Sequence, residues 1–305
     1  MNTSKPADHA ERMERALLSL DGLSVGDAFG ERFFLPPTVV MSVIEQRAMP
    51  RAPWGYTDDT EMALGIVQVL EEHGHIDQDA LATVFGARYR ENPYRGYGAT
   101  AQEILQEIYA GMPWRRVSSQ VFEGTGSKGN GGAMRVAPLG AYFADDLGRV
   151  VAEARASAEV THFHPEGQAG AIAIAVAAAW ASKWGQKHLP SRELFEVVLE
   201  HTPPGGTRRG LERARALSLE TSPVAAAKEL GSGSRVISED TVPFSVWCAA
   251  RHLGHYEEAL WATVSGLGDR DTTCAIVGGI VALSAGRESI PAAWLDARER
   301  LKRKV

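Results

Sequence analysis

Apolar residues recur along most of the chain at three- and four-residue steps, the spacing that places them on one face of a helix. Between residues 11 and 25, for example, Leu17, Leu20 and Leu23 follow this spacing. With helix caps and terminal glycines as boundaries, the same pattern predicts further helices over residues 61–72, 77–89, 101–110, 147–161, 165–183, 191–201, 207–217, 223–230, 242–253, 256–267 and 272–285. Very little of the sequence alternates as a strand does, so we predict one compact, all-α domain.

Four segments bear on how this domain is organised. The stretch 169–181 is apolar on every side, which predicts a central helix packed all round. It is shorter than the ~18–20 residues that span a bilayer, so we expect no membrane association. The Pro-Pro-Gly-Gly stretch 203–206 is the best candidate linker, but a single domain over residues 1–305 is expected. Residues 1–10 are expected to be flexible, and the basic tail 298–305 is interpreted as a solvated helix end.

Composition narrows the class of protein. A 44% hydrophobic and 23% charged content over 305 residues is ordinary for a soluble globular protein. The net charge of −6 gives no electrostatic sign of nucleic-acid binding. Cys248 and Cys274 both fall in apolar helical patterns, which argues against a disulfide framework and favours a reducing compartment. The polar N-terminus is unlike a secretory signal, and we expect a cytoplasmic protein.

Two acidic clusters stand just ahead of predicted helices: Thr-Asp-Asp-Thr at 57–60 and Asp-Arg-Asp-Thr at 269–272. Closely packed carboxylates repel one another unless protons or divalent cations intervene. Carboxylate and hydroxyl oxygens suit Mg²⁺ or Mn²⁺. The alternative is that these residues are ordinary helix N-caps. Capping needs only one side chain, however, and each cluster supplies two carboxylates, so we favour a metal site.

A glycine-rich loop lies between the clusters, with five glycines in residues 124–132 followed by a helical pattern. Such a loop lets backbone N–H groups approach an anion, and a helix N-terminus behind it adds a favourable dipole. Phosphate is the expected ligand; the alternative is a surface turn. No Gly-Lys-Ser/Thr closes the loop, so it is not a Walker loop.

Several aromatic and imidazole side chains remain open to two interpretations. His162 and His164 precede the apolar helix, where either contacts a ligand or serves as a cap or satisfied polar group. Trp54 and Tyr56 precede the first acidic cluster and either wall a cleft or pack in the core.

In chain order, five motifs resemble the signature of the ADP-ribosylglycohydrolase family. They are Gly-Asp-Ala-Phe-Gly at 26–30, Thr-Asp-Asp-Thr at 57–60, Gly-Asn-Gly-Gly-Ala-Met-Arg at 129–135, Thr-His at 161–162 and Gly-Asp-Arg-Asp-Thr at 268–272. The resemblance spans residues 16 to 286. Five motifs in the right order are far more specific than any one of them.

The resemblance implies a compact orthogonal helical bundle with two Mg²⁺ (or Mn²⁺) ions at the base of a cleft. It implies hydrolysis of the glycosidic bond between ADP-ribose and an acceptor, with an ADP-ribosylated protein or other ADP-ribosylated acceptor as partner. The implied metal ligands are Thr57, Asp58, Asp59, Asp269, Asp271 and Thr272. The implied substrate-binding residues are Gly126, Ser127, Lys128, Gly129, Asn130, Gly131 and His162.

Cleavage at an anomeric carbon develops oxocarbenium character, so the site needs a group that activates water and one that protonates the leaving group. Asp58, Asp59 and Asp269 are the candidate bases, and the residues leave the choice among them open.

Two departures from the family pattern bear on the acceptor. Arg270 replaces the usual threonine between the last two aspartates, where it either pairs outward or crowds the site. Relatives that act on serine-linked ADP-ribose carry a mobile glutamate at the position of Phe34; Glu31, three residues earlier, is a candidate catalytic substitute. We therefore expect an arginine-linked rather than a serine-linked substrate. The alternatives are a non-catalytic ADP-ribose-binding or structural relative, and a hydrolase of another ADP-ribose derivative.

Overall fold

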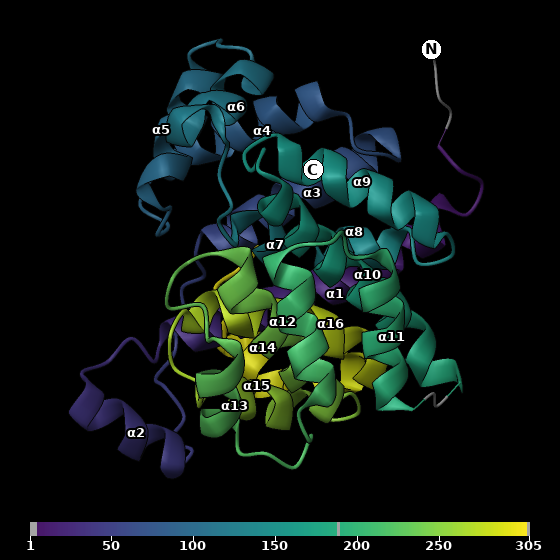
Figure 1. Ribbon diagram of the computed structural model, residues 1–305. Helices are drawn as coiled ribbons and strands as arrows, with labels where there is room; N and C mark the ends of the chain where they lie inside the picture. Colours follow the sequence, from purple (N-terminus) through teal and green to yellow (C-terminus); the bar gives the residue numbers. More distant parts are fainter. Residues whose placement is uncertain (1–4, 188–189, 304–305) are drawn as a thin grey trace.

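A computed structural model describes residues 5–187 and 190–303, and every regular element in these residues is a helix. The elements, in chain order, are α1 (His9–Glu31), α2 (Pro37–Glu45), α3 (Asp58–His73), α4 (Gln78–Glu91), α5 (Ala99–Tyr109), α6 (Trp114–Gly124), α7 (Gly131–Met134), α8 (Ala137–Tyr142), α9 (Leu147–Glu159), α10 (Pro165–Lys187), α11 (Ser191–His201), α12 (Gly206–Ala216), α13 (Pro223–Leu230), α14 (Ser238–Arg251), α15 (Tyr256–Val264), α16 (Arg270–Ala285), the 3₁₀ helix η1 (Arg287–Ser289) and α17 (Ala292–Ala297). The predicted all-α, single-domain fold is confirmed (Figure 1).

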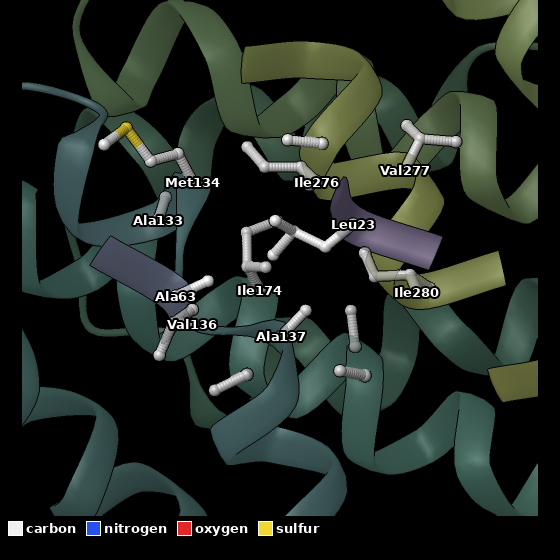
Figure 2. Close-up of a cluster of buried hydrophobic side chains, with 14 of the residues drawn as sticks. Leu23, Ala63, Ala133, Met134, Val136, Ala137, Ile174, Ile276, Val277 and Ile280 are labelled. Atoms are coloured by element: carbon white, nitrogen blue, oxygen red, sulfur yellow. The ribbon is translucent and has the colours of Figure 1, made fainter. Parts of the chain in front are cut away.

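The core is built around α1, α10 and α16. The predicted central helix is α10, whose apolar stretch 169–181 is buried on all sides. Figure 2 shows Ile174 of this helix beside Leu23 of α1 and Ile276 and Ile280 of α16. Burial of side chains of this kind stabilises a fold by roughly 1.5–3 kcal/mol each, so this three-helix contact is a main source of stability.

Glycines let α1 and α16 approach until their backbones touch. Gly22, Gly26 and Gly30 recur every fourth residue and so share one face of α1. A Cβ atom at Gly26 would collide with the carbonyl of Cys274, and one at Gly30 with the carbonyl of Arg270. The close contact therefore brings the end of α1 to the start of α16, where the second acidic cluster lies.

The structure adds helices that periodicity did not predict. The segment of α2 is rich in β-branched residues and lacks a polar face, so it carries no helical pattern. The six residues of α8 are all buried. Helix α14 begins at Ser238, four residues before the predicted start, because Pro243 is accommodated inside the helix, with Gly210 of α12 leaving room for its ring.

The linker candidate 203–206 joins α11 to α12 within the bundle. At the N-terminus, α1 already begins at His9, so the flexible segment expected over residues 1–10 is at least partly helical; residues 1–4 lie outside the described residues. Among the described residues, no helix has both the length and the apolar character to cross a membrane.

The interpretation of the basic tail as a solvated helix end is wrong. Helix α17 ends at Ala297, and Arg298 pairs with Trp54 in an isolated β-bridge. A carboxylate oxygen of Glu299 accepts a hydrogen bond from the backbone N–H of Tyr56 at 3.0 Å. These contacts hold the tail against the segment that leads into α3. Residues 304–305 lie outside the described residues.

Candidate functional site

A cleft of about 860 Å³ lies where the N-terminal ends of α3 and α16 meet. Of the metal-ligating, substrate-binding and catalytic residues proposed from the sequence, only Thr57 and Glu31 do not line it. Those that do are Asp58, Asp59, Gly126, Ser127, Lys128, Gly129, Asn130, Gly131, His162, Asp269, Asp271 and Thr272. Segments from four distant parts of the chain therefore share one cavity, as a binding site for a sizeable ligand requires.

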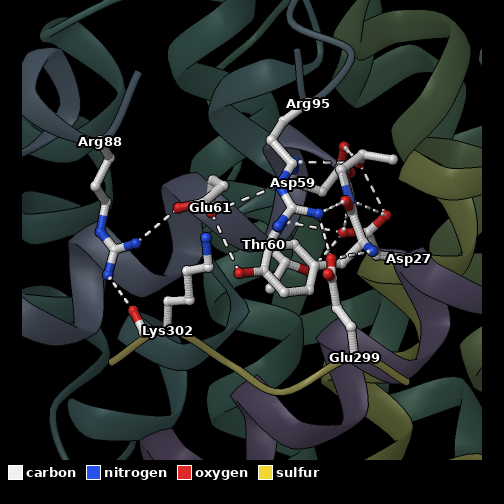
Figure 3. A network of polar contacts seen from close by, with 10 residues as sticks. Asp27, Asp59, Thr60, Glu61, Arg88, Arg95, Glu299 and Lys302 are labelled. Carbon is white, nitrogen blue, oxygen red and sulfur yellow. Dashed lines mark hydrogen bonds and ion pairs between the residues drawn. The ribbon is translucent and has the colours of Figure 1, made fainter. Parts of the chain in front are cut away.

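A fifth carboxylate, Asp27 of α1, lies buried behind the first acidic cluster. Its two oxygens accept hydrogen bonds from the backbone N–H and the hydroxyl of Thr57, at 3.0 and 2.8 Å, and of Thr60, at 3.1 and 2.5 Å. Figure 3 shows Asp27 and Thr60 within one network of polar contacts at the start of α3. Asp27 belongs to the motif at 26–30, but no role was predicted for it from the sequence. A charged residue in an otherwise apolar and small-residue stretch of α1 was the available signal.

Thr57 is the N-cap of α3, as the capping interpretation of the first cluster requires of one side chain. Its hydroxyl caps α3 by accepting from the N–H of Asp59 at 3.4 Å, and it lies 2.8 Å from Asp27 and 3.1 Å from Asp59. A hydroxyl has one proton to donate, so it serves one of these carboxylates at a time. Because the Thr57 hydroxyl caps α3, the carboxylates of Asp58 and Asp59 are not needed as helix caps.

The clustered carboxylates hold their protons unusually tightly. Burial, followed by the charge of Asp27, raises the pKa of Asp58 to about 8. Burial, followed by the charge of Asp271, raises the pKa of Asp59 well above its ordinary value, and burial followed by Asp269 does the same for Asp271. Burial also raises the pKa of Asp27 to about 6, despite its threonine hydrogen bonds. This cluster needs a cation or protons to be stable near neutral pH.

The donor atoms suit a hydrated divalent cation. Oδ1 of Asp59 and Oδ1 of Asp271 are both buried without a hydrogen-bond partner, which is costly unless something binds them. Within the described residues, no three His, Cys, Asp or Glu side chains converge into a ready-made cage. Mg²⁺ commonly binds through one or two carboxylates and keeps several waters, so these residues fit such an ion.

The glycine loop is fixed against the second cluster. The side-chain N–H₂ of Asn130 donates to Oδ2 of Asp269 at 2.7 Å and to the hydroxyl of Thr241 at 3.1 Å. The carbonyl of Lys128 accepts from the N–H of Ser238 at 3.1 Å. The loop is thus part of the cleft wall. Helix α7 behind it has only four residues, so the helix-dipole contribution expected from the sequence is small.

His162 closes the cleft behind this loop, and its tautomer follows from its neighbours. The fully buried Arg135 donates to the hydroxyl oxygen of Thr161 at 2.9 Å, which leaves the Thr161 proton for Nδ1 of His162, 2.8 Å away. We assign the ring proton to Nε2, and a Cβ atom at Gly129 or Gly131 would lie 3.1 or 3.0 Å from this nitrogen. Burial, with the charge of Arg135, lowers the pKa of His162 to about 3. His162 is therefore a neutral donor.

Arg270 points away from the carboxylates that flank it. Its Nη1 donates to the carbonyl of Phe33 at 2.7 Å, and its guanidinium lies 4.9 Å from the ring centre of Phe34. It therefore does not crowd the cleft, and it forms no salt bridge within the part of the chain that the structure describes. Glu31, the last residue of α1, lies outside the cleft wall; partial burial and the charges of Asp27 and Asp269 raise its pKa.

One ion pair connects the first turn of α3 to α4, and a second packs against the segment before α3. Glu61 pairs with Arg88 at 2.7 Å, and both side chains are buried. Arg95 pairs with Glu299 and stacks 4.0 Å from the ring centre of Tyr56 (Figure 3). Trp54 and Tyr56 are buried and do not line the cleft, so both belong to the packing.

A second concavity of about 690 Å³ adjoins the cleft, and both share Gly96 in their walls. Four tyrosines line it: Tyr89, Tyr94, Tyr97 and Tyr109. No pattern in the sequence pointed to this feature, because its residues come from α4, α5 and the loop between them.

Comparison with known proteins agrees with this geometry. The family model for ADP-ribosylglycohydrolase matches residues 8–305. ADP-ribosylhydrolase ARH3 of Homo sapiens is 27% identical over 95% of this chain and 90% of its own length. The Mus musculus protein of the same name is 30% identical over 80% and 73%.

The fold itself has a solved relative. A structure described as an ADP-ribosylglycohydrolase-related protein complex superposes with a TM-score of 0.67, at 25% identity, over 95% of this chain and 94% of that one. The chain therefore belongs to the ADP-ribosylglycohydrolase family and is a hydrolase of glycosidic bonds to ADP-ribose.

Proposed function

We propose that this protein releases ADP-ribose from an acceptor in a reaction that depends on divalent metal, with arginine-linked ADP-ribose preferred over serine-linked. The observation that carries this proposal is a hydrogen bond between the two halves of the cleft, the glycine loop and the acidic cluster. Asn130 of the glycine loop donates to Asp269 of the acidic cluster at 2.7 Å. A ligand that carries a diphosphate and a ribose has matching partners on the two sides of that bond.

The proposed metal site uses Thr57, Asp58, Asp59, Asp269, Asp271 and Thr272 to hold two Mg²⁺ or Mn²⁺ ions. Orientation of ribose hydroxyls and polarisation of a water are the chemistry that such ions supply. The bare carboxylate oxygens of Asp59 and Asp271 support this assignment.

The proposed diphosphate site is the loop from Gly126 to Gly131, with His162 as a neutral N–H donor behind it. The water-activating carboxylate is one of Asp58, Asp59 and Asp269, all of which line the cleft. Glu31 ranks below them because it does not. The preference for arginine follows from Phe34, which leaves no carboxylate where serine-directed relatives carry one, and Arg270 packs on its ring. The buried free thiols of Cys248 and Cys274 support a cytoplasmic location.

The direct test is release of free ADP-ribose from arginine-, serine- and nucleic-acid-linked substrates across a range of Mg²⁺ and Mn²⁺ concentrations. Release from the arginine-linked substrate alone is the expected result. No release from any of the three, at any metal concentration, would reject the proposal in favour of a non-catalytic ADP-ribose-binding protein or a hydrolase of another derivative. Release without divalent metal would reject the metal requirement.

Metal removal is expected to make the protein's stability fall as pH rises above neutrality. The folded-state pKa of Asp58 is about 8, against 3.8 ordinarily, so the folded state keeps a proton that the unfolded chain has lost. That contribution to stability is complete below pH 3.8 and disappears as pH rises through about 8.

The measurement is the Tm in chelator between about pH 6.5 and 8.5. This window avoids His162, whose lowered pKa makes stability rise with pH from about 3 to 6.5. A fall of at least about 4 °C is expected, and saturating Mg²⁺ should remove it. A Tm that stays flat in chelator and in Mg²⁺ alike would contradict the electrostatic account of the cluster.

Replacing His162 by Ala is expected to raise the KM about 10- to 100-fold with a smaller change in kcat, because a hydrogen bond to a charged group contributes roughly 1.5–3 kcal/mol. The imidazole itself should add no pH dependence to the wild-type KM between about 5 and 7, since it stays neutral there. His162→Gln, which retains an N–H donor, should recover part of the loss. An unchanged KM in His162→Ala would show that the imidazole does not contact the ligand.

A further inference from the structure

Exposed apolar side chains gather on the segment between α1 and α3. We call residues 34–49 the arm. Phe34, Leu35, Val39 and Met49 are 49%, 37%, 45% and 46% exposed, and all four belong to it. Figure 1 shows α2, the helix of the arm, projecting away from the rest of the bundle. Single exposed apolar residues are normal on protein surfaces, but a local group of them marks an interaction site.

The arm is a built structure with both ends anchored. At its start, the neighbouring Phe33 is fully buried, with its ring 5.6 Å from that of Trp261. At its end, Nη1 and Nη2 of Arg47 donate to the two carboxylate oxygens of Glu258, at 2.5 and 2.6 Å. Between these points, Val40 is buried against the core. Of the exposed side chains, Val39 lies on α2 and the other three lie in the segments that flank this helix, between the two anchors.

The arm is connected to the proposed catalytic centre through a single side chain. Arg270 lies in sequence between Asp269 and Asp271, both of which line the cleft. The Arg270 guanidinium donates a hydrogen bond to the carbonyl of Phe33 and stacks over the ring of Phe34. The first exposed apolar residue of the arm is thus one arginine side chain away from the carboxylates. Phe34 is therefore a direct neighbour of the segment that carries two of the cleft-lining carboxylates.

We propose that the arm is a docking surface for the apolar flank of the acceptor polypeptide in an ADP-ribosylated protein. This inference rests on the proposed function and adds that part of the acceptor itself, as well as its ADP-ribose, is recognised. The nine residues of α2 span about 14 Å. That is too little for the ~1,000 Å² of a stable interface, which argues against a second copy of this chain. A short-lived contact between an enzyme and its substrate does not need such a large interface.

The experiment compares two valines that are alike in exposure and position. Val39 is the third residue of α2 and 45% exposed; Val224 is the second residue of α13, 40% exposed, and does not line the cleft. Each is replaced by Asp, and kcat/KM is measured on an ADP-ribosylated protein and on ADP-ribosyl-arginine. Val39→Asp is expected to lower kcat/KM for the protein about tenfold through KM, with no change for the small substrate. Val224→Asp should change neither.

Each other outcome overturns the proposal. If Val39→Asp and Leu35→Asp both leave the protein substrate unaffected, the arm does not dock it. If both substrates lose activity equally, the arm acts on the cleft. If the wild type is a dimer by light scattering and Val39→Asp makes it a monomer, a second copy covers the arm. The small substrate tests the proposed function separately: if the wild type cleaves neither substrate, that function fails and the docking proposal fails with it.

Discussion

Replacing Asp269 by Ala is expected to lower kcat/KM by at least about 10³-fold, or roughly 4 kcal/mol, without unfolding the protein. The carboxylate is a proposed metal ligand and lines the cleft. Its loss removes hydrogen bonds with Asn130, Asp271 and Thr272, but Asn130 retains Thr241 as a partner, and Asp271 and Thr272 line the cleft, where water can reach them. Although Asp269 is the N-cap residue of α16, its side chain makes no capping hydrogen bond. Loss of activity should therefore separate from loss of structure.

The stability of Asp269→Ala in chelator provides a second test of the same prediction. In the wild type, the charge of Asp269 contributes to the raised pKa values of Asp58, Asp59 and Asp271. Removing it relieves repulsion in the metal-free protein, so the variant should be at least as stable as the wild type above pH 7. Circular dichroism and thermal unfolding, both in chelator, measure this.

Asp146→Ala is a control with the opposite expectation. The Asp146 side chain caps α9 by accepting from the N–H of Arg149 at 3.0 Å, and it does not line the cleft. This variant should lose about 1 kcal/mol of stability and keep its activity. Global unfolding of Asp269→Ala, or more than about a tenth of wild-type turnover, would show that Asp269 does not have the proposed role.

Local patterns were enough to predict most helices and to draw attention to segments that line the cleft, whereas the assignment of individual residues in the glycine loop and of His162 came from the family resemblance. Apolar periodicity predicted α11 and α13 at their observed bounds, because caps, prolines and glycines mark both ends of each. Clustered charge before two helices drew attention to both acidic segments. These signals lie within a few residues of one another along the chain, so one sequence suffices to read them.

The remaining features depend on contacts between distant segments. The direction of Arg270 is set by the carbonyl of Phe33, and the conformation of the tail by its pairing with Trp54. Neither partner is a sequence neighbour, and a run of basic residues looks the same whether solvated or held. The helix of the arm was missed because its segment is rich in β-branched residues and lacks a polar face, so the sequence carries no helical pattern there.

Asp27 is the case with the largest consequence. A single aspartate in α1 supports the site because the start of α3, about 30 residues further along the chain, packs against it. It then lies where two N–H groups and two hydroxyls at the start of α3 converge. We expect Asp27→Ala to destabilise the metal-bound protein by roughly 2–6 kcal/mol. The two hydroxyls can turn to other acceptors, but the two buried N–H groups cannot, and each costs about 1–3 kcal/mol when left unpaired.

Two opposing effects set the size of this loss, and metal distinguishes them. Asp27 also repels Asp58 and Asp59, so its removal relieves strain in metal-free protein. With Mg²⁺ bound, that repulsion is already offset and the unpaired N–H groups dominate. Urea unfolding should therefore show a larger loss in Mg²⁺ than in chelator. A loss under about 1 kcal/mol in both conditions would contradict the supporting role.

The activity of Asp27→Ala should fall as well, but for a different reason from that of Asp269→Ala. Without its acceptor the first turn of α3 is free to move, and Asp58 and Asp59 move with it. Asp27→Asn is the graded control, because it keeps the shape and one acceptor oxygen but turns an N–H₂ group toward a donor; it should fall between wild type and Asp27→Ala in both stability and activity. Loss of activity in proportion to stability identifies a support, whereas loss of activity at unchanged stability identifies a ligand or a base.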